Sequence, residues 1–335
     1  MKNRMNALKA IKGIFSPRQS MPIWDNYLVT PTHIERAGGI KKSPFIAAVK
    51  LFTPTTINQS VVLKEVESDA YLVDSNYACF GGVKTTYVSA EEYPDTFTGL
   101  VNDMSTITLR DYQWSRIVRI SEAVAIDETR FTLSCVLLDS KGSAVGTDGH
   151  MLSFNDNVGS GTLSGDLLIP AQIIRALRKA VVHSIQRIGE EHGVLSGTLY
   201  GIPFEVTYRY ESAKYPEWKA VLPKKSGHRL EVPVKPLSAA LKQVIKRGTD
   251  KKPVVKIYFT DNGLHLEHKD PESSFDTVLP FNGSTYMGPP IAFNACYLLT
   301  AIDGSEKVTL DIHGELAPLL VHAEECTSIV MPIRY

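Results

Sequence analysis

Short stretches of alternating apolar and polar residues dominate the chain, and turn-forming residues separate them. The clearest example is Lys256–Thr260, which is followed by Asp-Asn-Gly and then by Leu264–Glu267, a pattern typical of a β-hairpin. Two further hairpins are predicted at 130–146, around Asp-Ser-Lys-Gly, and at 307–322, around His-Gly-Glu. The pattern therefore predicts a chain rich in antiparallel β-structure.

Apolar residues at three- and four-residue spacing interrupt these strands and predict helices. We expect helices over Asn6–Phe15, Tyr112–Val124, Ala171–Ile185 and Leu237–Arg247, with a shorter one at Phe293–Ala301. A helix followed by strands recurs along the chain, and Glu92–Phe97 is echoed by Lys214–Lys219, which suggests duplication. The prediction is an α+β protein with three similar domains, at 1–104, 105–227 and 228–335.

Length and composition limit the kind of protein this is. The 335 residues suit two or three domains, and 36 basic residues balance 36 acidic ones, so the total charge indicates no partner. Four cysteines lie far apart without metal-ligand spacing, which is typical of thiols buried in a reducing cytoplasm. No apolar run is long enough for a membrane span, and the first residues lack the apolar core of a signal peptide. We expect a cytoplasmic protein without membrane contact, and we expect no metal or cofactor.

Positive charge gathers on one face of the predicted helices. The basic residues are spaced three or four apart, with apolar residues opposite them, and such a face either keeps a helix solvated or contacts DNA phosphates. No aromatic residues are interleaved with these cations, so duplex DNA fits better than stacked single-stranded bases. The candidate DNA contacts on the helices are Lys9, Lys12, Arg116, Arg119, Arg175, Arg178, Lys179, Lys242 and Lys246.

The segment Val145–Leu152 predicts a strand that enters a tight Gly turn and presents Thr147, Asp148 and His150. One interpretation is half of a catalytic site, with Asp148 and His150 as a general base or metal ligands. The alternative is an Asp that caps the backbone of its own turn. No third ligand or nucleophile is identifiable, so the turn is favoured and no catalytic residue is assigned. A metal site at His265 and His268 is disfavoured too, because a strand aims residues three apart to opposite faces.

Four motifs in the same order resemble the bacterial β sliding clamp family, the β subunit of DNA polymerase III. They are Thr147–Leu152 (Thr-Asp-Gly-His-Met-Leu), Tyr215–Pro223 (Tyr-Pro-Glu-Trp-Lys-Ala-Val-Leu-Pro), Phe293–Leu299 (Phe-Asn-Ala-Cys-Tyr-Leu-Leu) and Met331–Tyr335 (Met-Pro-Ile-Arg-Tyr). The resemblance that these motifs support extends over residues 105–335. The first domain resembles the family less, although Arg18 occupies the place of a loop Arg that touches DNA.

The resemblance implies three clamp domains per subunit and two subunits that close a ring around duplex DNA, with helices lining a positively charged channel. A non-catalytic processivity factor of this kind tethers a polymerase and is served by a clamp loader. Both partners would use a pocket between the second and third domains that binds short linear peptides. Its lining would be Leu133, Thr147, Gly149, His150, Met151, Leu152, Pro216, Val221, Asn294, Tyr297, Ile329, Val330, Met331 and Pro332.

Several departures from the family pattern bear on this expectation. Met151 and Ala220 stand where many members have Arg, which predicts a more apolar pocket. Lys246 and Arg247 fall where the helix facing the neighbouring subunit is usually apolar, and residues 52–71 are too few for the family's second helix. The departures fit a divergent clamp, such as one encoded by a phage or mobile element. They also keep open a clamp-fold regulator or decoy that binds clamp partners without encircling DNA.

Overall fold

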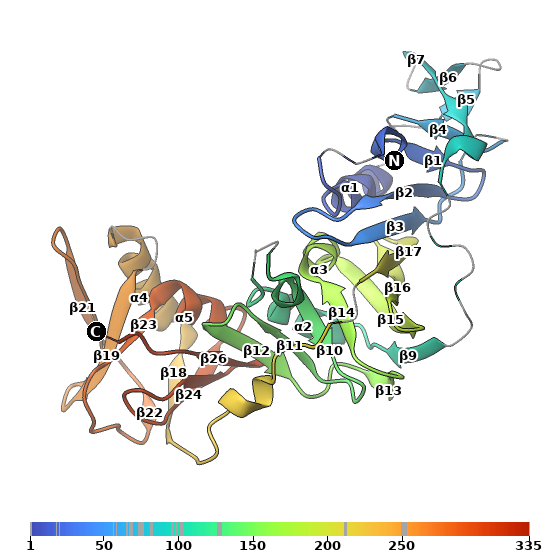
Figure 1. The fold of residues 1–335 in the computed structure, drawn as a ribbon. Helices are drawn as coiled ribbons and strands as arrows, with labels where there is room; N and C mark the ends of the chain where they lie inside the picture. Colours follow the sequence, from blue (N-terminus) through green and yellow to red (C-terminus); the bar gives the residue numbers. More distant parts are fainter. Residues whose placement is uncertain are drawn as a thin grey trace. The chain divides into compact units, whose positions relative to one another are not determined.

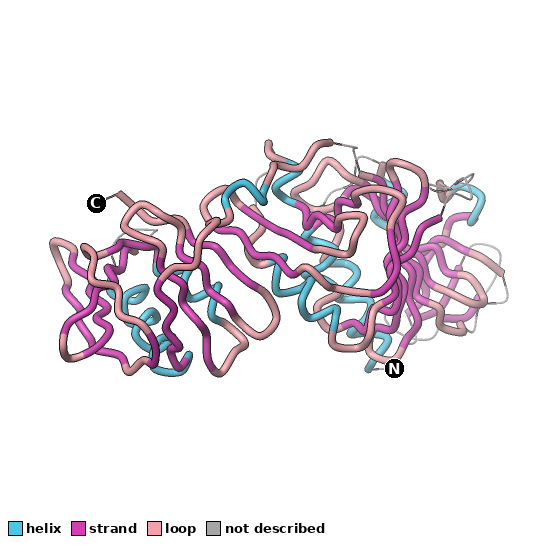
Figure 2. The backbone as a smooth tube through the Cα atoms, turned by 90° about the horizontal axis from the view of Figure 1, so that it is seen from below, coloured by secondary structure: helices cyan, strands magenta, loops and turns pink. Residues whose placement is uncertain are grey.

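The computed structural model describes the whole chain except residues 1, 18, 20, 56, 58, 65, 67–69, 73–76, 81–82, 95–96, 98–99, 101–103, 126–128, 211–212, 249–252 and 335. Residue contacts group it into two compact units. Unit 1 comprises residues 1–121, 126–144 and 156–214, and unit 2 comprises 122–125, 145–155 and 215–335. Figure 2 shows that strands and loops make up most of both units, with short helices between them. The three-domain division made from the sequence stays a prediction.

Unit 1 is built on one ten-stranded sheet with the order β13-β9-β15-β16-β17-β3-β2-β1-β4-β8. In this sheet β3 pairs with β17, so strands from the two ends of the unit's sequence lie side by side (Figure 1). A three-stranded sheet, β5-β6-β7, and the pair β10-β14 complete the strands of the unit. Their bounds are β1 (Tyr27–Val29), β2 (Ile34–Gly39), β3 (Ile46–Leu51), β4 (Val61–Leu63), β5 (Ala70–Leu72), β6 (Tyr77–Phe80), β7 (Val83–Thr86), β8 (Val88–Ser89), β9 (Met104–Thr108), β10 (Cys135–Leu138), β13 (Ser160–Thr162), β14 (Leu167–Pro170), β15 (Ala180–Ile188), β16 (His192–Leu199) and β17 (Ile202–Arg209).

The helices of unit 1 are short and amphipathic. They are α1 (Lys2–Lys12), α2 (Gln113–Ser121) and α3 (Ala171–Ala176), with 3-10 turns η1 (Pro22–Asp25), η2 (Ala90–Glu92) and η3 (Phe131–Ser134). Helix α2 buries Trp114, whose indole N–H donates to the Leu177 carbonyl at 2.9 Å just after α3. A buried indole with a satisfied N–H fixes how the two helices pack.

Unit 2 combines the strand order β12-β26-β25-β24-β18-β22 with a second sheet, β21-β20-β19-β23. Helices α4 and α5 pack together, and their apolar residues share one core with both sheets, including Leu241, Phe293 and Leu298. The elements are β11 (Ala144–Thr147, in this unit from Val145), β12 (Met151–Asn155), η4 (Trp218–Val221), β18 (His228–Pro233), α4 (Val234–Arg247), β19 (Val254–Thr260), β20 (Gly263–Lys269), β21 (Ser274–Leu279), β22 (Asn282–Gly283), β23 (Ile291–Asn294), α5 (Ala295–Ile302), β24 (Lys307–Ile312), β25 (Leu319–His322) and β26 (Thr327–Val330).

The predicted hairpins at 256–267 and 307–322 are confirmed as β19–β20 and β24–β25. The hairpin predicted at 130–146 is shorter than predicted, because Phe131–Ser134 forms a 3-10 turn. The Ser134 hydroxyl closes this turn by donating to the Phe131 carbonyl. Strand β20 also confirms that His265 and His268 lie on a strand; His265 stacks on Tyr258, and His268 contacts the Val254 carbonyl. In the described part of the chain, no group of three or more His, Cys, Asp or Glu residues could hold a metal ion.

The helix predicted at Ala171–Ile185 is wrong over most of its length. Helix α3 ends at Ala176, a turn follows, and Ala180–Ile188 is strand β15. Val181, Val182 and Ile185 are β-branched and favour a strand, while pairing with both β9 and β16 gives this strand ladder partners on each side. Arg178 and Lys179 therefore lie in a turn, not on a helical face.

Two smaller differences concern the N-terminal part of the chain. Helix α1 covers Lys2–Lys12, so it starts earlier than predicted, and Phe15 lies beyond it in a β-bridge with Ile40. The described residues within 52–71 form β4 and the start of β5 and include no helix. No helix among the described residues is both long and apolar enough to cross a membrane.

Candidate functional site

The turn between β11 and β12 is fixed by its own side chains. The Asp148 Oδ1 accepts the backbone N–H groups of His150 and Met151, each at 2.8 Å. Thr147 donates its hydroxyl to the Met151 carbonyl at 2.6 Å, and Gly149 adopts a φ of 94°, which favours glycine. The prediction of a backbone-capping Asp is confirmed.

Helix α5 supplies a further partner to this turn. The Tyr297 hydroxyl donates to the Asp148 Oδ2 at 2.6 Å, so both carboxylate oxygens of Asp148 accept hydrogen bonds. The Tyr297 ring also lies nearly parallel to the His150 imidazole, with centroids 6.4 Å apart. Asn294 orients the helix, because its side chain caps the first turn by accepting the Cys296 N–H at 2.8 Å. A carboxylate used in this way builds structure and is a poor general base.

The C-terminal segment runs beside the same turn. Strand β26 pairs with β12, with Val330 opposite Met151, and the Met331 N–H donates to the His150 carbonyl at 3.0 Å. Two residues later the Ile333 N–H donates to the Ala292 carbonyl at 2.8 Å, which ties the end of the chain to β23. We call the exposed and half-exposed side chains that these contacts gather the tail surface: His150, Tyr297, Met331 and Pro332.

A second group of predicted residues surrounds η4. The Trp218 ring packs on Phe154 of β12, with centroids 5.1 Å apart, which holds η4 against β12. Pro216 and Val221 lie exposed on either side of this anchor, and 45% of Val221 is accessible. A single exposed aliphatic residue is ordinary on a protein surface, so the role of Val221 in a pocket stays a prediction.

Several predicted lining residues are buried instead. Met151 is only 2% exposed and packs in the core of unit 2 together with Val330, while Leu152 and Ile329 are buried as well. The Met151 side chain therefore does not make the surface more apolar in this conformation. Leu133 belongs to η3 of unit 1 and is half-buried there, so its place in the predicted pocket stays a prediction.

The predicted DNA contacts lie on helices and turns of both units. Lys9 and Lys12 on α1, Lys242 and Lys246 on α4, and Arg178 and Lys179 in the turn after α3 are exposed. Arg116, Arg119 and Arg175 are partly buried: Arg116 donates to the Asn157 carbonyl and Arg175 to the Ser121 carbonyl, at 2.7 and 2.6 Å. Arg18 lies outside the described residues. The cations thus divide into exposed ones and ones that brace the fold.

The cysteines fit the expectation of structural thiols where their side chains are described. Cys135 and Cys326 are buried, and burial raises the pKa of the Cys135 thiol to about 12. Cys296, at the start of α5, is half-buried, and burial raises its pKa too. The Cys135 and Cys296 thiols therefore stay protonated at neutral pH and are poor nucleophiles. The Cys79 side chain lies outside the described ones.

Sequence reasoning missed the contact between Asp148 and Tyr297. The two residues are far apart in the chain, and no local pattern predicts that α5 presents its third residue to the β11–β12 turn. The signal that was available is the Asn-x-x-Tyr spacing, because an N-cap Asn sets the direction in which the tyrosine leaves the first helical turn.

No family model matches the sequence. The β sliding clamp of Salmonella typhimurium is 23% identical over 371 residues, an alignment that covers 98% of this chain and 97% of the relative. The β sliding clamp of Escherichia coli K12 is 20% identical over 366 residues, with the same coverage.

Solved structures agree with these relatives. A DNA polymerase sliding clamp from Pseudomonas aeruginosa aligns with a TM-score of 0.76 at 18% identity, covering 100% of this chain and 98% of the other. The DNA polymerase III β subunit of Caulobacter crescentus aligns with a TM-score of 0.77 at 17% identity and the same coverage. The α+β clamp fold thus extends over the full chain. Over nearly its whole length the chain is similar in sequence to β sliding clamps and shares the fold of solved sliding clamps.

Proposed function

We propose that this protein is a DNA sliding clamp, a non-catalytic processivity factor that encircles duplex DNA and tethers a polymerase. The observation that carries the proposal is the match to β sliding clamps over 98% of this chain and 97% of the relative. A match to one domain would support only a shared module. A match over the whole length supports the shared task, in which a closed ring slides along the duplex.

The exposed cations support a backbone-directed contact with DNA. Lys9, Lys12, Lys242 and Lys246 project from helices whose opposite faces are buried, and Arg178 and Lys179 project from a turn. Ammonium and guanidinium groups bind phosphates without reading sequence, and such contacts weaken as salt rises. A sliding protein needs this combination. Three clamp domains, at 1–104, 105–227 and 228–335, and a homodimeric ring in the cytoplasm belong to the same proposal.

Ring closure is tested by mass and by topology. The protein should sediment as a dimer or higher ring over a range of micromolar concentrations. Once loaded on nicked circular duplex by a clamp loader with ATP, it should co-elute with the circle and be lost when the DNA is cut once. A monomer at every concentration, without retention on circles, would contradict the proposal and point to a protein that binds clamp partners off DNA.

Charge reversal tests the DNA contact. The double variant Lys242→Glu/Lys246→Glu should bind duplex more weakly, and its slope of log affinity against log salt should fall by about 2, near 0.9 for each lost phosphate contact. Lys269→Glu/Lys256→Glu, on strands of the same unit, is the control with the same charge change. Equal slopes for both variants would place the α4 cations in bulk water.

The tail surface is our candidate for the peptide site of polymerase and clamp loader. It joins the turn that Asp148 holds, the parallel rings of His150 and Tyr297, and a C-terminal segment held by two backbone hydrogen bonds. Deletion of residues 331–335 should abolish binding of a fluorescent peptide from a polymerase tail. Deletion of 334–335 alone spares the Ile333–Ala292 bond and should keep most of the affinity. If both truncated proteins fold and bind alike, the tail is not part of the site.

A further inference from the structure

A cavity of about 230 Å³ opens on one face of the unit 1 sheet, remote in sequence from the tail surface. It is lined by Leu28 and Ala48 of the sheet, by the charged residues Glu35, Lys50 and Glu205, which we call the rim, and by Tyr93 and Phe97, which we call the wall. Pockets for drug-sized ligands are larger, roughly 300–1,000 Å³. The cavity is the right size for one long side chain or a short alkyl ligand.

Strand register brings the rim residues together. Glu35 of β2 lies opposite Lys50 of β3, and Lys50 lies opposite Glu205 of β17. Because residues directly opposite each other share a face, the three charges form a row across three neighbouring strands. The next row on this face begins with Ala37 and Ala48, whose small side chains leave the space that the cavity occupies.

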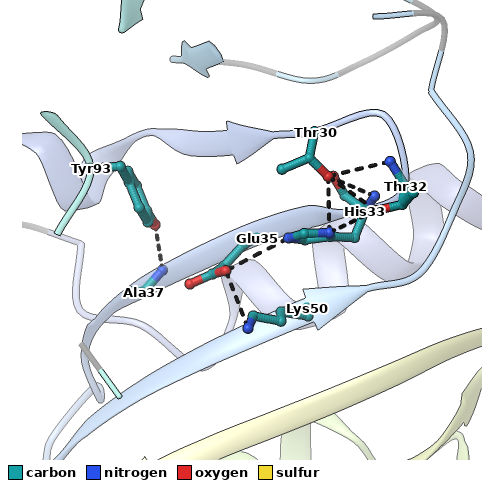
Figure 3. A network of polar contacts seen from close by, with 7 residues as sticks. All are labelled: Thr30, Thr32, His33, Glu35, Ala37, Lys50 and Tyr93. Atoms are coloured by element: carbon teal, nitrogen blue, oxygen red, sulfur yellow. Dashed lines mark hydrogen bonds and ion pairs between the residues drawn. The ribbon is translucent and has the colours of Figure 1, made fainter. Parts of the chain in front are cut away.

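The wall is tied to the sheet by a hydrogen bond. Strand β1 pairs with β2 only as far as Glu35, so among the described residues the β2 edge beyond Glu35 has no strand partner on that side. The Tyr93 hydroxyl takes that place and accepts the Ala37 N–H at 2.7 Å, as Figure 3 shows. Phe97 packs edge-to-face on His192, with centroids 6.0 Å apart. The aromatic wall is therefore preformed.

The charged row contains one carboxylate, that of Glu205, without an ion pair in the described part of the chain. The Lys50 ammonium lies 3.9 Å from the Glu35 carboxylate, as does the His33 Nε2 (Figure 3). Burial, and then the neighbouring Lys50, lowers the pKa of His33, so this imidazole is neutral at neutral pH. Within the described residues Glu205 forms no ion pair. Glu205 is therefore the carboxylate of this row that can pair with the charge of a ligand.

We propose that this cavity binds an organic cation, the guanidinium or ammonium group of a ligand with an apolar stem. The Glu205 carboxylate receives the charge, the Tyr93 and Phe97 rings offer their faces to the cation, and Leu28 and Ala48 contact the stem. Two sources carry this chemistry: an Arg or Lys side chain of a peptide and a free polyamine. The proposal does not depend on whether the protein encircles DNA.

Calorimetric titration of the full-length protein at low salt tests the site. The probes are Nα-acetyl-arginine methylamide, its neutral citrulline counterpart and spermidine. We expect the arginine probe to bind and the citrulline probe to bind at least tenfold more weakly, because a charge-assisted hydrogen bond is lost. Tighter binding of spermidine would identify a polyamine as the source, and tighter binding of an arginine tripeptide would identify a peptide.

Two variants and a control locate the binding. Glu205→Gln should weaken the arginine probe about tenfold or more, and Ala48→Leu should abolish binding by filling the cavity. Glu190→Gln, in the exposed turn between β15 and β16, removes the same charge from the same unit and should have no effect. Equal affinity of Glu205→Gln, Glu190→Gln and the wild type, or equal binding of the citrulline probe, would overturn the proposal, even if Ala48→Leu fails to fold.

Discussion

Two carboxylates in different units of this protein illustrate how the same group serves structure in one place and stays available in another. Asp148 accepts two backbone N–H groups and the Tyr297 hydroxyl, so its charge is fully used within unit 2. Glu205 lies on the rim of a cavity in unit 1, beside Lys50 in the ladder and without an ion pair among the described residues. Unused hydrogen-bonding capacity, and not the presence of an acid, marks a site for a ligand.

Removal of the Asp148 carboxylate gives the largest expected effect on stability. Asp148→Ala leaves the His150 and Met151 N–H groups and the Tyr297 hydroxyl without their acceptor. Loss of a backbone cap costs about 1 kcal/mol and loss of a hydrogen bond to a charged group about 1.5–3 kcal/mol. We expect the free energy of unfolding to fall by about 2–3 kcal/mol, measured by urea denaturation.

Asp148→Asn is the matched control for that change, because it keeps an oxygen acceptor at the same place. It should retain most of the stability that Asp148→Ala loses. If Asp148→Ala unfolds at the same urea concentration as the wild type, the carboxylate does not hold the turn. Asp148 is then not a structural acid, and its contrast with Glu205 is contradicted.

Tyr297→Phe isolates one of the three hydrogen bonds. The ring and its parallel arrangement with His150 remain, and only the donor to Asp148 is lost. We expect a loss of about 1 kcal/mol in the free energy of unfolding, since the carboxylate keeps its two backbone partners. Peptide affinity should change less than it does in the 331–335 deletion. Tyr258→Phe, on β19, is a control tyrosine in the same unit.

The sequence predicted much of this architecture, and the errors have physical causes. The hairpin at 256–267 was predictable because an Asn-Gly turn and alternating residues are local signals. Helix α3 was overestimated because Ile and Val at helical spacing also suit a strand, and the pairing of β15 with β9 and β16 decides between them. The tail surface followed from motifs at 147–152, 293–299 and 331–335.

The cavity was not predictable from the sequence. It depends on β3 pairing with β17, which brings Lys50 next to Glu205 from far along the chain. Tyr93 does stand out, as part of the segment Glu92–Phe97 that Lys214–Lys219 echoes, but that echo indicates only duplication. Only the hydrogen bond to Ala37 shows that this tyrosine forms a wall.

His33, whose Nε2 lies 3.9 Å from the Glu35 carboxylate, links the stability of unit 1 to pH. Burial and Lys50 lower its pKa from the usual 6.5, so the folded protein binds this proton less readily than the unfolded chain. The stabilising contribution is complete above pH 6.5 and is lost as the pH falls below it. We expect the stability of the wild type, compared by thermal unfolding between pH 8 and 5, to fall more than that of His33→Gln. Because His33 is only partly buried, solvent screens its charge, and the effect should be smaller than that of Tyr297→Phe.

If His33→Gln and the wild type lose stability in parallel over this range, protonation at His33 does not contribute. Other histidines, such as His192 and His322, then account for the pH dependence, since burial lowers the pKa of each.

Glu205→Gln gives the smallest expected change in stability and the sharpest form of the comparison. The substitution removes an attraction to Lys50 and a repulsion from Glu35, which lie in the same row of the ladder. The two effects oppose each other, and no hydrogen bond is broken, so the free energy of unfolding should stay within about 0.5 kcal/mol of the wild type. The same variant should nevertheless bind the arginine probe about tenfold more weakly. A large loss of stability would show that Glu205 is a structural acid like Asp148, and the contrast between the two carboxylates would disappear.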